Sequence, residues 1–114
     1  MKYSVRPRIR IVRDDGTIVL GPGKADLLAA IARTGSIRAA AKDLGMSYMR
    51  AWTLVRVMNG VFRSPLVEKV RGGSDQGGAA LTSRGTAVLE MYQRMEKDAE
   101  RAVAAAWKDM KKHL

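Results

Sequence analysis

Two helix signals separated by a tight turn impose the strongest constraint on how this chain folds. Ser36 is followed by a short amphipathic stretch, and Ser47 by a longer one, residues 48–62. A serine before a helix caps it, because its hydroxyl accepts a hydrogen bond from a backbone amide of the first turn. Gly45 suits the left-handed conformation that ends a helix. The pattern therefore predicts a compact helix-turn-helix over residues 36–62.

The flanking segments predict one helix before this unit and a β-ribbon and a long helix after it. Residues 22–34 have an apolar helical face, and Pro22 suits the first turn of a helix. Residues 66–81 are two short β-rich runs around a glycine-rich turn. Residues 83–112 form the longest amphipathic stretch, with Thr82 as its cap. A helix-turn-helix followed by such a ribbon, or wing, is the pattern of a winged helix-turn-helix.

Residues 5–20 carry the pattern of an N-terminal β-hairpin. Apolar and basic residues alternate from Val5 to Arg13, which predicts a half-buried strand, and a hairpin turn signal follows at Asp15 and Gly16. The strand carries a row of arginines: Arg6, Arg8, Arg10 and Arg13. These side chains extend a DNA footprint in one interpretation and pack against a dimer partner in another. Arginines on a strand edge also discourage aggregation.

Together these elements predict the fold class and the domain organisation. We expect a mainly α-helical chain with a small β content, folded as a single domain over residues 1–114. Its architecture is a winged helix-turn-helix with an N-terminal β-hairpin and a long C-terminal dimerisation helix.

The distribution of charge points to a polyanionic partner. The chain has 21 Lys and Arg against 11 Asp and Glu, a net charge of +10. Residues 33–84 hold nine basic and three acidic side chains, whereas residues 85–114 are nearly balanced. Such an excess fits nucleic acid or an anionic membrane surface. No apolar stretch approaches the roughly 20 residues of a membrane-spanning helix, and the N-terminus lacks a signal-peptide core. We therefore expect a soluble, cytoplasmic protein that does not bind a membrane.

Residue usage argues against catalysis and against a metal or cofactor. The chain has no cysteine and a single histidine, His113, beside its last residue. The chain therefore lacks the histidine and cysteine side chains that metal sites of this kind and catalytic triads require. The glycine-rich run at residues 72–78 lacks the lysine and following helix of a nucleotide-binding loop. The methionines are best explained as packing material. We expect no enzyme, no catalytic residue, no cofactor and no metal.

A specific combination of residues covers positions 35–85: GSIRAAAKDLGMSYMRAWTLVRVMN, and then LVEKVRGGSDQGGAALTSRG. This combination resembles the DNA-binding domain of the molybdate-dependent transcriptional regulators of the ModE type, which are related to the LysR-type helix-turn-helix. The resemblance implies DNA binding and dimerisation through the long helix. In that family an oxyanion-binding domain follows the long helix, whereas this chain stops at Leu114. The resemblance therefore gives no support for molybdate sensing, and the sequence indicates no small-molecule effector.

Candidate DNA-contacting residues lie on the outer face of helix 48–62, on the wing and at the helix caps. They are Ser36, Arg38, Ser47, Tyr48, Met49, Arg50, Trp52, Thr53, Arg56, Lys69, Arg71, Ser74, Gln76 and Arg84. An arginine placed on guanine discriminates against other bases by about 1–3 kcal/mol. In the alternative interpretation, Arg50 and Arg56 are a solvated face, Trp52 packs against the wing, and the two serines are only caps. An apolar seam for dimerisation follows on the last helix: Val88, Tyr92, Met95, Ala99, Val103 and Met110.

The leading hypothesis is a homodimeric, sequence-specific DNA-binding transcription regulator. It would read the major groove with helix 48–62 and the backbone or minor groove with the wing. One alternative is a non-specific architectural protein that coats DNA, which the high charge favours. Another is a protein–protein adaptor, because winged helices also serve that role.

Overall fold

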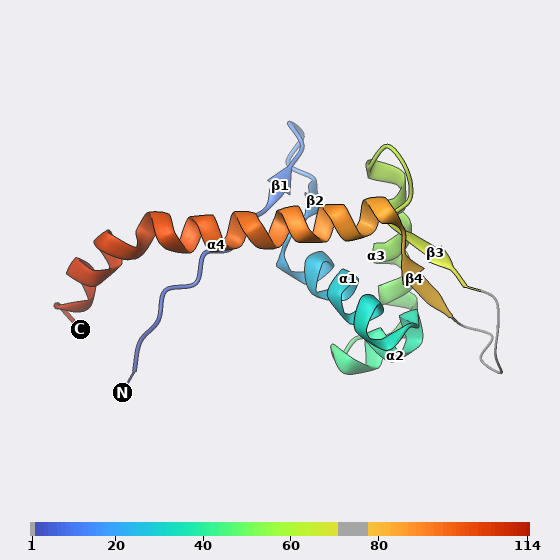
Figure 1. Ribbon diagram of the computed structural model, residues 1–114, viewed down its shortest axis with the longest axis horizontal. Coiled ribbons are helices and arrows are strands. Elements are labelled where there is room, and N and C mark those ends of the chain that lie inside the picture. The colour runs from blue at the N-terminus through green and yellow to red at the C-terminus, as the bar shows by residue number, and fades with distance from the viewer. Residues whose placement is uncertain (1, 71–77) are drawn as a thin grey trace.

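The computed structural model describes residues 2–70 and 78–114, in which a pair of short strands precedes three helices and a second pair precedes a last long helix (Figure 1). Their order is β1 (Ile11–Val12), β2 (Ile18–Leu20), α1 (Pro22–Thr34), α2 (Ile37–Asp43), α3 (Tyr48–Val61), β3 (Val67–Lys69), β4 (Ala79–Leu81) and α4 (Ser83–Lys111). The helices lie close to the predicted ranges, and the chain is a winged helix-turn-helix with a long last helix. The predicted fold class is therefore confirmed.

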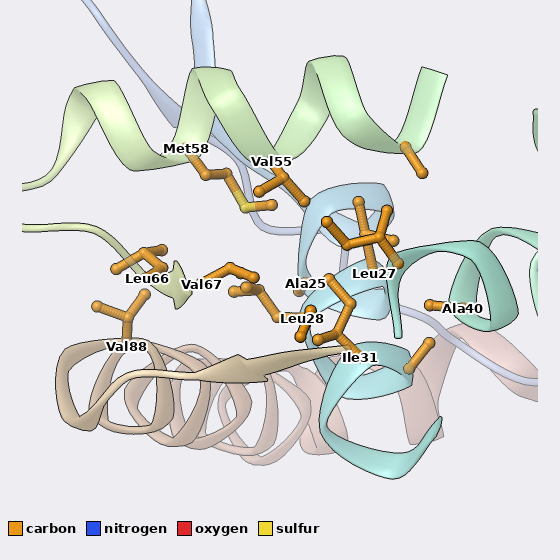
Figure 2. Close-up of a cluster of buried hydrophobic side chains, with 14 of the residues drawn as sticks. Ala25, Leu27, Leu28, Ile31, Ala40, Val55, Met58, Leu66, Val67 and Val88 are labelled. Atoms are coloured by element: carbon orange, nitrogen blue, oxygen red, sulfur yellow. The ribbon is translucent and has the colours of Figure 1, made fainter. Parts of the chain in front are cut away.

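Helix α1 lies at the centre of the core. Leu27, Leu28 and Ile31 are fully buried, and they pack between the other helices and the wing (Figure 2). The buried residues that share this cluster are Ala40 and Ala41 on α2, and Ala51, Val55 and Met58 on α3. Alanines at a helix crossing let the two backbones approach closely. The small residues of the sequence therefore set the tight packing of α2 on α3.

The turns between the helices use the capping residues that the sequence predicted. The hydroxyl of Ser36 accepts a hydrogen bond from the amide of Ala39 at 2.9 Å, and that of Ser47 accepts one from Arg50 at 3.1 Å. Gly45 adopts a left-handed φ of 67° after α2. Helix α2 ends at Asp43, and α3 ends at Val61, one residue earlier than expected. The predicted helix-turn-helix is therefore present with its caps.

The N-terminal hairpin is much shorter than predicted. Strand pairing joins only β1 and β2, with Ile11 opposite Leu20, and residues 5–10 form no strand. The prediction of a strand from Val5 was wrong, because β2 ends at Leu20 and the chain then enters α1. No backbone is left to pair with the preceding residues. Instead, the hydroxyl of Tyr92 on α4 donates a hydrogen bond of 2.6 Å to the carbonyl of Ile9.

The wing and α4 meet at a close backbone contact. Strands β3 and β4 pair antiparallel, with Val67 opposite Leu81. The amide of Thr82 then donates to the carbonyl of Leu66 at 2.9 Å. Gly85, in the first turn of α4, lies directly against that same carbonyl, and a Cβ atom there would overlap it. This glycine therefore lets α4 start flush against the wing.

Only the first third of α4 belongs to the core. Val88 and Tyr92 are buried inside this chain, so their assignment to a dimerisation seam was wrong. At 29 residues, α4 runs for about 44 Å and projects beyond the other helices (Figure 1). Met95 and Met110 on the projecting part are 38% and 60% exposed. The seam that a partner could cover therefore begins after Tyr92.

The described residues hold neither a membrane span nor a metal cluster. None of the helices in residues 2–70 and 78–114 is both long and apolar enough to span a bilayer. Within the same residues, no group of three or more His, Asp or Glu side chains could hold a metal ion.

The Gly85 contact predicts opposite effects for two glycine substitutions. Gly85→Ala should destabilise the fold by about 3 kcal/mol, because the added methyl group overlaps the carbonyl of Leu66. Gly60→Ala on α3 should stabilise it by about 0.5–1 kcal/mol, because an added Cβ meets nothing and alanine favours a helix. Urea unfolding of both variants at one protein concentration measures the difference. Equal stabilities would contradict the packing at Gly85.

The Tyr92 hydrogen bond predicts a loss of stability in alkali. Burial, followed by the negative charges of Glu96 and Asp26, raises the pKa of the Tyr92 hydroxyl above its usual value of 10.0. The stability that the neutral hydroxyl contributes is present below about pH 10 and is lost as the pH rises through the folded-state pKa. Tyr92→Phe should cost about 1 kcal/mol at neutral pH, because the carbonyl of Ile9 loses its partner. Thermal unfolding should show that the difference in stability between the wild-type protein and Tyr92→Phe shrinks at high pH. A difference that stays constant with pH would contradict the prediction.

Candidate nucleic-acid interface

The outer face of α3 is open to solvent. Ala51, Val55 and Met58 turn into the core, which leaves the opposite side of the helix uncovered. Met49 is 67% exposed on this side, and Thr53 and Arg56 are exposed beside it. The hydroxyl of Thr53 donates to the carbonyl of Met49 at 2.9 Å. The face therefore presents one apolar, one hydroxyl and one cationic side chain in neighbouring turns.

Two arginines on this side of the molecule are stacked on aromatic rings. The guanidinium of Arg38 on α2 lies 4.4 Å from the ring centroid of Tyr48 at the start of α3. That of Arg56 lies 5.0 Å from the ring centroid of Trp52, which is half-buried against the core. Each stack holds a positive charge in place and leaves the donors at the edge of the guanidinium accessible. Four predicted site residues are thereby brought together in two pairs.

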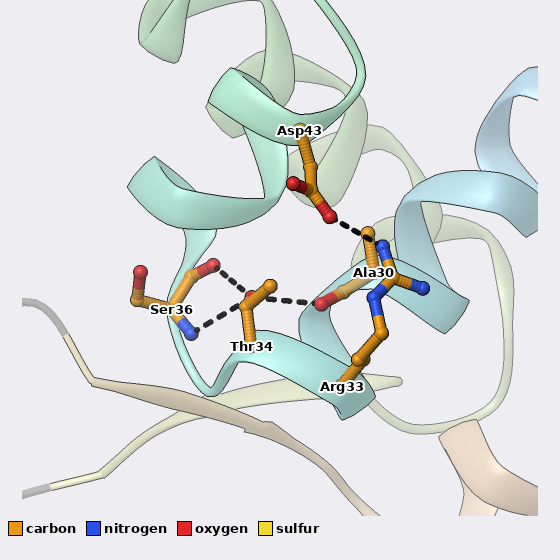
Figure 3. Close-up of polar contacts among 5 residues, drawn as sticks. All are labelled: Ala30, Arg33, Thr34, Ser36 and Asp43. Carbon is orange, nitrogen blue, oxygen red and sulfur yellow. Dashed lines mark hydrogen bonds and ion pairs between the residues drawn. The ribbon is translucent and has the colours of Figure 1, made fainter.

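The bracing helix α2 is fixed to α1 by polar contacts at both of its ends (Figure 3). Arg33 near the end of α1 forms a 2.6 Å ion pair with Asp43 at the end of α2. Both side chains are at least half exposed, so the pair contributes little to stability. At the other end, the hydroxyl of Thr34 donates to the carbonyl of Ala30 within α1 at 2.7 Å, and it accepts a hydrogen bond of 3.5 Å from the amide of Ser36, the N-cap of α2. These contacts join the end of α1 to both ends of α2.

Asn59 connects α3 to the wing. Its side-chain carbonyl accepts hydrogen bonds from the amides of Leu66 and Val67, at 2.8 and 3.1 Å, and its amide donates to the carbonyl of Val67 at 3.1 Å. This clamp fixes strand β3 against the last turns of α3. Asn59 was not among the residues predicted from the sequence. The available signal was a polar amide next to Met58, at the margin of the apolar stripe.

The remaining predicted residues lie around this face or outside the described part. Lys69 at the end of β3 and Arg84 in the first turn of α4 are exposed. Ser36 and Ser47 are helix caps whose oxygens already accept backbone amides. Arg50 is exposed on the edge of α3 that faces the N-terminal segment. Arg71, Ser74 and Gln76 lie outside the described residues.

The arginines of the interface are not neutralised by carboxylates of the described residues. Within residues 2–70 and 78–114, ion pairs join Arg33 to Asp43 and two further pairs on α4. The predicted contact residues Arg38, Arg50 and Arg56 form none of these pairs. The positive charge next to α3 is therefore available to a polyanion.

Comparison with known proteins identifies the segment that forms this site. Residues 24–86 match the family model described as "Bacterial regulatory helix-turn-helix protein, lysR family". The match runs from the first turn of α1 to the first turn of α4 and includes more than half of the chain.

The chain is similar to several molybdenum-related proteins. It is 44% identical over 77 residues to the molybdenum-pterin-binding protein MopB of Rhodobacter capsulatus, covering 68% of this chain and 28% of MopB. It is 38% identical over 96 residues to the molybdenum transport protein ModE of Azotobacter vinelandii, covering 84% and 35%. The DNA-binding transcriptional dual regulator ModE of Escherichia coli (strain K12) is 38% identical over 81 residues, covering 71% and 31%. The chain thus spans about a third of the length of these relatives.

Solved structures share the fold. A crystal structure of the CbnR_DBD-DNA complex superimposes with a TM-score of 0.61 at 24% identity, covering 77% of this chain and 95% of that chain. Full CbnR, a LysR family transcriptional regulator, superimposes with a TM-score of 0.56 at 25% identity, covering 74% and 27%.

Proposed function

The chain belongs to the bacterial regulatory helix-turn-helix proteins of the lysR family, and we propose that it is a homodimeric, sequence-specific DNA-binding transcription regulator. The observation that carries the proposal is the uncovered face of α3, where Met49, Thr53 and Arg56 are exposed. Relatives from five bacterial species carry the name ModE, and those from four of these species are named as transcriptional regulators.

Helix α3 has the shape and side chains for a major groove. A groove about 12 Å wide admits one helix, which a second helix braces across the backbone. In this chain α2 is that brace, and its Arg38 is exposed over Tyr48. Thr53 and Arg56 then face base edges, while Lys69 on the wing and Arg84 on α4 face phosphates. Sequence-specific contacts come from the first group, and general affinity from the second.

In the proposed mechanism, the protein acts only by binding to a particular site on DNA. The protein performs no catalysis and needs no cofactor, and it acts by occupying a promoter or a site beside it. A regulator of this kind works where the bacterial chromosome is, so we place it in the cytoplasm.

A second copy of the chain covers the projecting part of α4. The seam on this part of α4 has apolar side chains that recur at helical spacing. Met95, Ala106 and Met110 are exposed, and Ala99 and Val103 are half-buried. Two α4 helices packed along this seam form a homodimer that presents two copies of α3. Such a dimer reads half-sites about 34 Å apart or a multiple of that distance.

Selection of bound sites from random DNA, followed by titration of the selected site, tests DNA recognition. Arg56→Ala should weaken binding to the selected site by about 5- to 100-fold, and binding to random DNA by less, because the variant cannot hydrogen-bond a base edge. Affinity should fall steeply as salt rises, because phosphate contacts release counterions.

Lys97→Ala provides a control of equal charge. Lys97 is exposed on α4, on the side opposite the apolar seam. Equal losses of affinity for Arg56→Ala and Lys97→Ala would remove Arg56 as a base reader. A selected site bound no better than random DNA would replace the proposal with an architectural DNA-coating protein.

A charge placed on the α4 seam should separate the two copies. Val103→Glu should shift the protein from twice the mass of one chain to the mass of a single chain in sedimentation equilibrium, because the carboxylate would be buried between the helices. Ala104→Glu is the matched control, since Ala104 is exposed on the opposite side of α4. A wild-type protein that sediments as a single chain would contradict the dimer.

A further inference from the structure

A pocket of about 350 Å³ lies between the N-terminal segment, the start of α1 and α3. Four cationic side chains line it, and we call it the basic pocket: Arg8, Arg10, Lys24 and Arg50. The other lining residues that the structure describes are apolar or glycine, and none is acidic. Four positive charges from three separate segments of the chain therefore face one opening.

The cations of the basic pocket have no counter-charge in the described part of the chain. The ion pairs formed by residues 2–70 and 78–114 lie elsewhere, on α1–α2 and along α4. Clustered like charges repel one another, and an anion in the space between them would relieve this repulsion. The positive charge of the basic pocket therefore favours the binding of an anion.

Lys24 is the least solvated of the four cations. It is half-buried, and burial lowers the pKa of its ammonium group. Its Nζ atom donates one hydrogen bond of 2.7 Å, to the carbonyl of Ile18. A primary ammonium has three donors, and the partly desolvated charge gains most from an anionic acceptor. Lys24 also lies in the first turn of α1, where no side chain caps the helix and its dipole favours negative charge.

The two arginines of the N-terminal segment are held at the pocket by the residue between them. The carbonyl of Ile9 accepts the Tyr92 hydrogen bond, and its side chain packs against the core. The segment also passes close to Gly21, where a Cβ atom would meet Arg10 Cγ at 3.5 Å and the Ile9 carbonyl at 3.9 Å. With Ile9 fixed, Arg8 and Arg10 have their backbones anchored beside α1. Binding an anion there costs little ordering of the chain.

The basic pocket adjoins the proposed DNA-reading helix. Arg50 and Leu54 line the pocket from one edge of α3, and Thr53 lies on the exposed face of the same turns. We infer that the basic pocket binds a phosphate group, supplied by the backbone of the duplex that α3 contacts. This inference rests on the proposed function and adds the N-terminal segment and Lys24 to the DNA footprint.

Neutral variants of the arginines test the inference in the full chain. Arg8→Gln with Arg10→Gln should weaken binding to the selected site and to random DNA alike, by about tenfold at physiological salt, because a phosphate contact carries no sequence information. The slope of log affinity against log salt should become shallower by about 0.9 for each phosphate that is no longer neutralised. Arg6→Gln with Arg13→Gln is the matched control, because it removes the same charge from the same segment outside the pocket. Thermal unfolding checks that both double variants are folded.

A duplex with single neutral methylphosphonates locates the phosphate. At one position in each half-site, the replacement should weaken wild-type binding several-fold and leave binding by the Arg8/Arg10 variant unchanged. The inference is overturned if wild-type protein binds DNA and the two double variants behave alike, or if no methylphosphonate position couples to Arg8 and Arg10.

Inorganic phosphate separates this inference from the proposed function. If the wild-type protein binds no DNA, the proposed function fails, and titration with inorganic phosphate then decides the pocket. Saturable binding that is lost in the Arg8/Arg10 variant and kept in the Arg6/Arg13 variant supports a phosphate site filled by the free ion. Absence of such binding overturns the site as well.

Discussion

The close crossing of α2 on α3 positions everything else in the molecule. Ala40 and Ala41 of α2 and Ala51 of α3 are small side chains buried in the same core cluster as Leu27 and Ile31 of α1. Each fully buried leucine or isoleucine contributes about 1.5–3 kcal/mol. A larger residue at any of the three alanines would overpack this cluster. The exposed face of α3 is a consequence, because this crossing covers only the inner side of the helix.

A second set of contacts fixes the wing and α4 relative to α3. Asn59 binds the backbone of Leu66 and Val67, and Leu66 in turn contacts Thr82 and Gly85. These contacts are backbone-directed, so they fix geometry more than they add burial. The wing and the long helix therefore take their orientation from the last turns of α3. The proposed dimer, in which two copies of α3 lie a set distance apart, needs this kind of rigid link.

Charges are used differently in two parts of the molecule. Carboxylates pair with cations at the α1–α2 ends and along α4, where the pairs are exposed and weak. Around α3, cations stack on rings or line the basic pocket instead. Stacking and backbone anchoring hold these charges in place without neutralising them. Six of the 21 basic side chains of the chain thus lie on or beside α3, where a polyanion would approach.

Periodicity and capping are local properties of a chain, and they were enough to specify the helices, their caps and the outer face of α3. They extended the N-terminal hairpin too far and placed Tyr92 on a dimer seam, because strand pairing needs a partner backbone and burial depends on what packs over a helix. Contacts between residues far apart in the sequence are decided only by the packing of the whole chain. One such contact is the hydrogen bond between the carbonyl of Ile9 and the hydroxyl of Tyr92, 83 positions away. That contact sets Arg8 and Arg10 beside Lys24. Helical hydrogen bonds close within a few residues and can be inferred from spacing, whereas a pocket forms from separate segments and exists only once they are packed together.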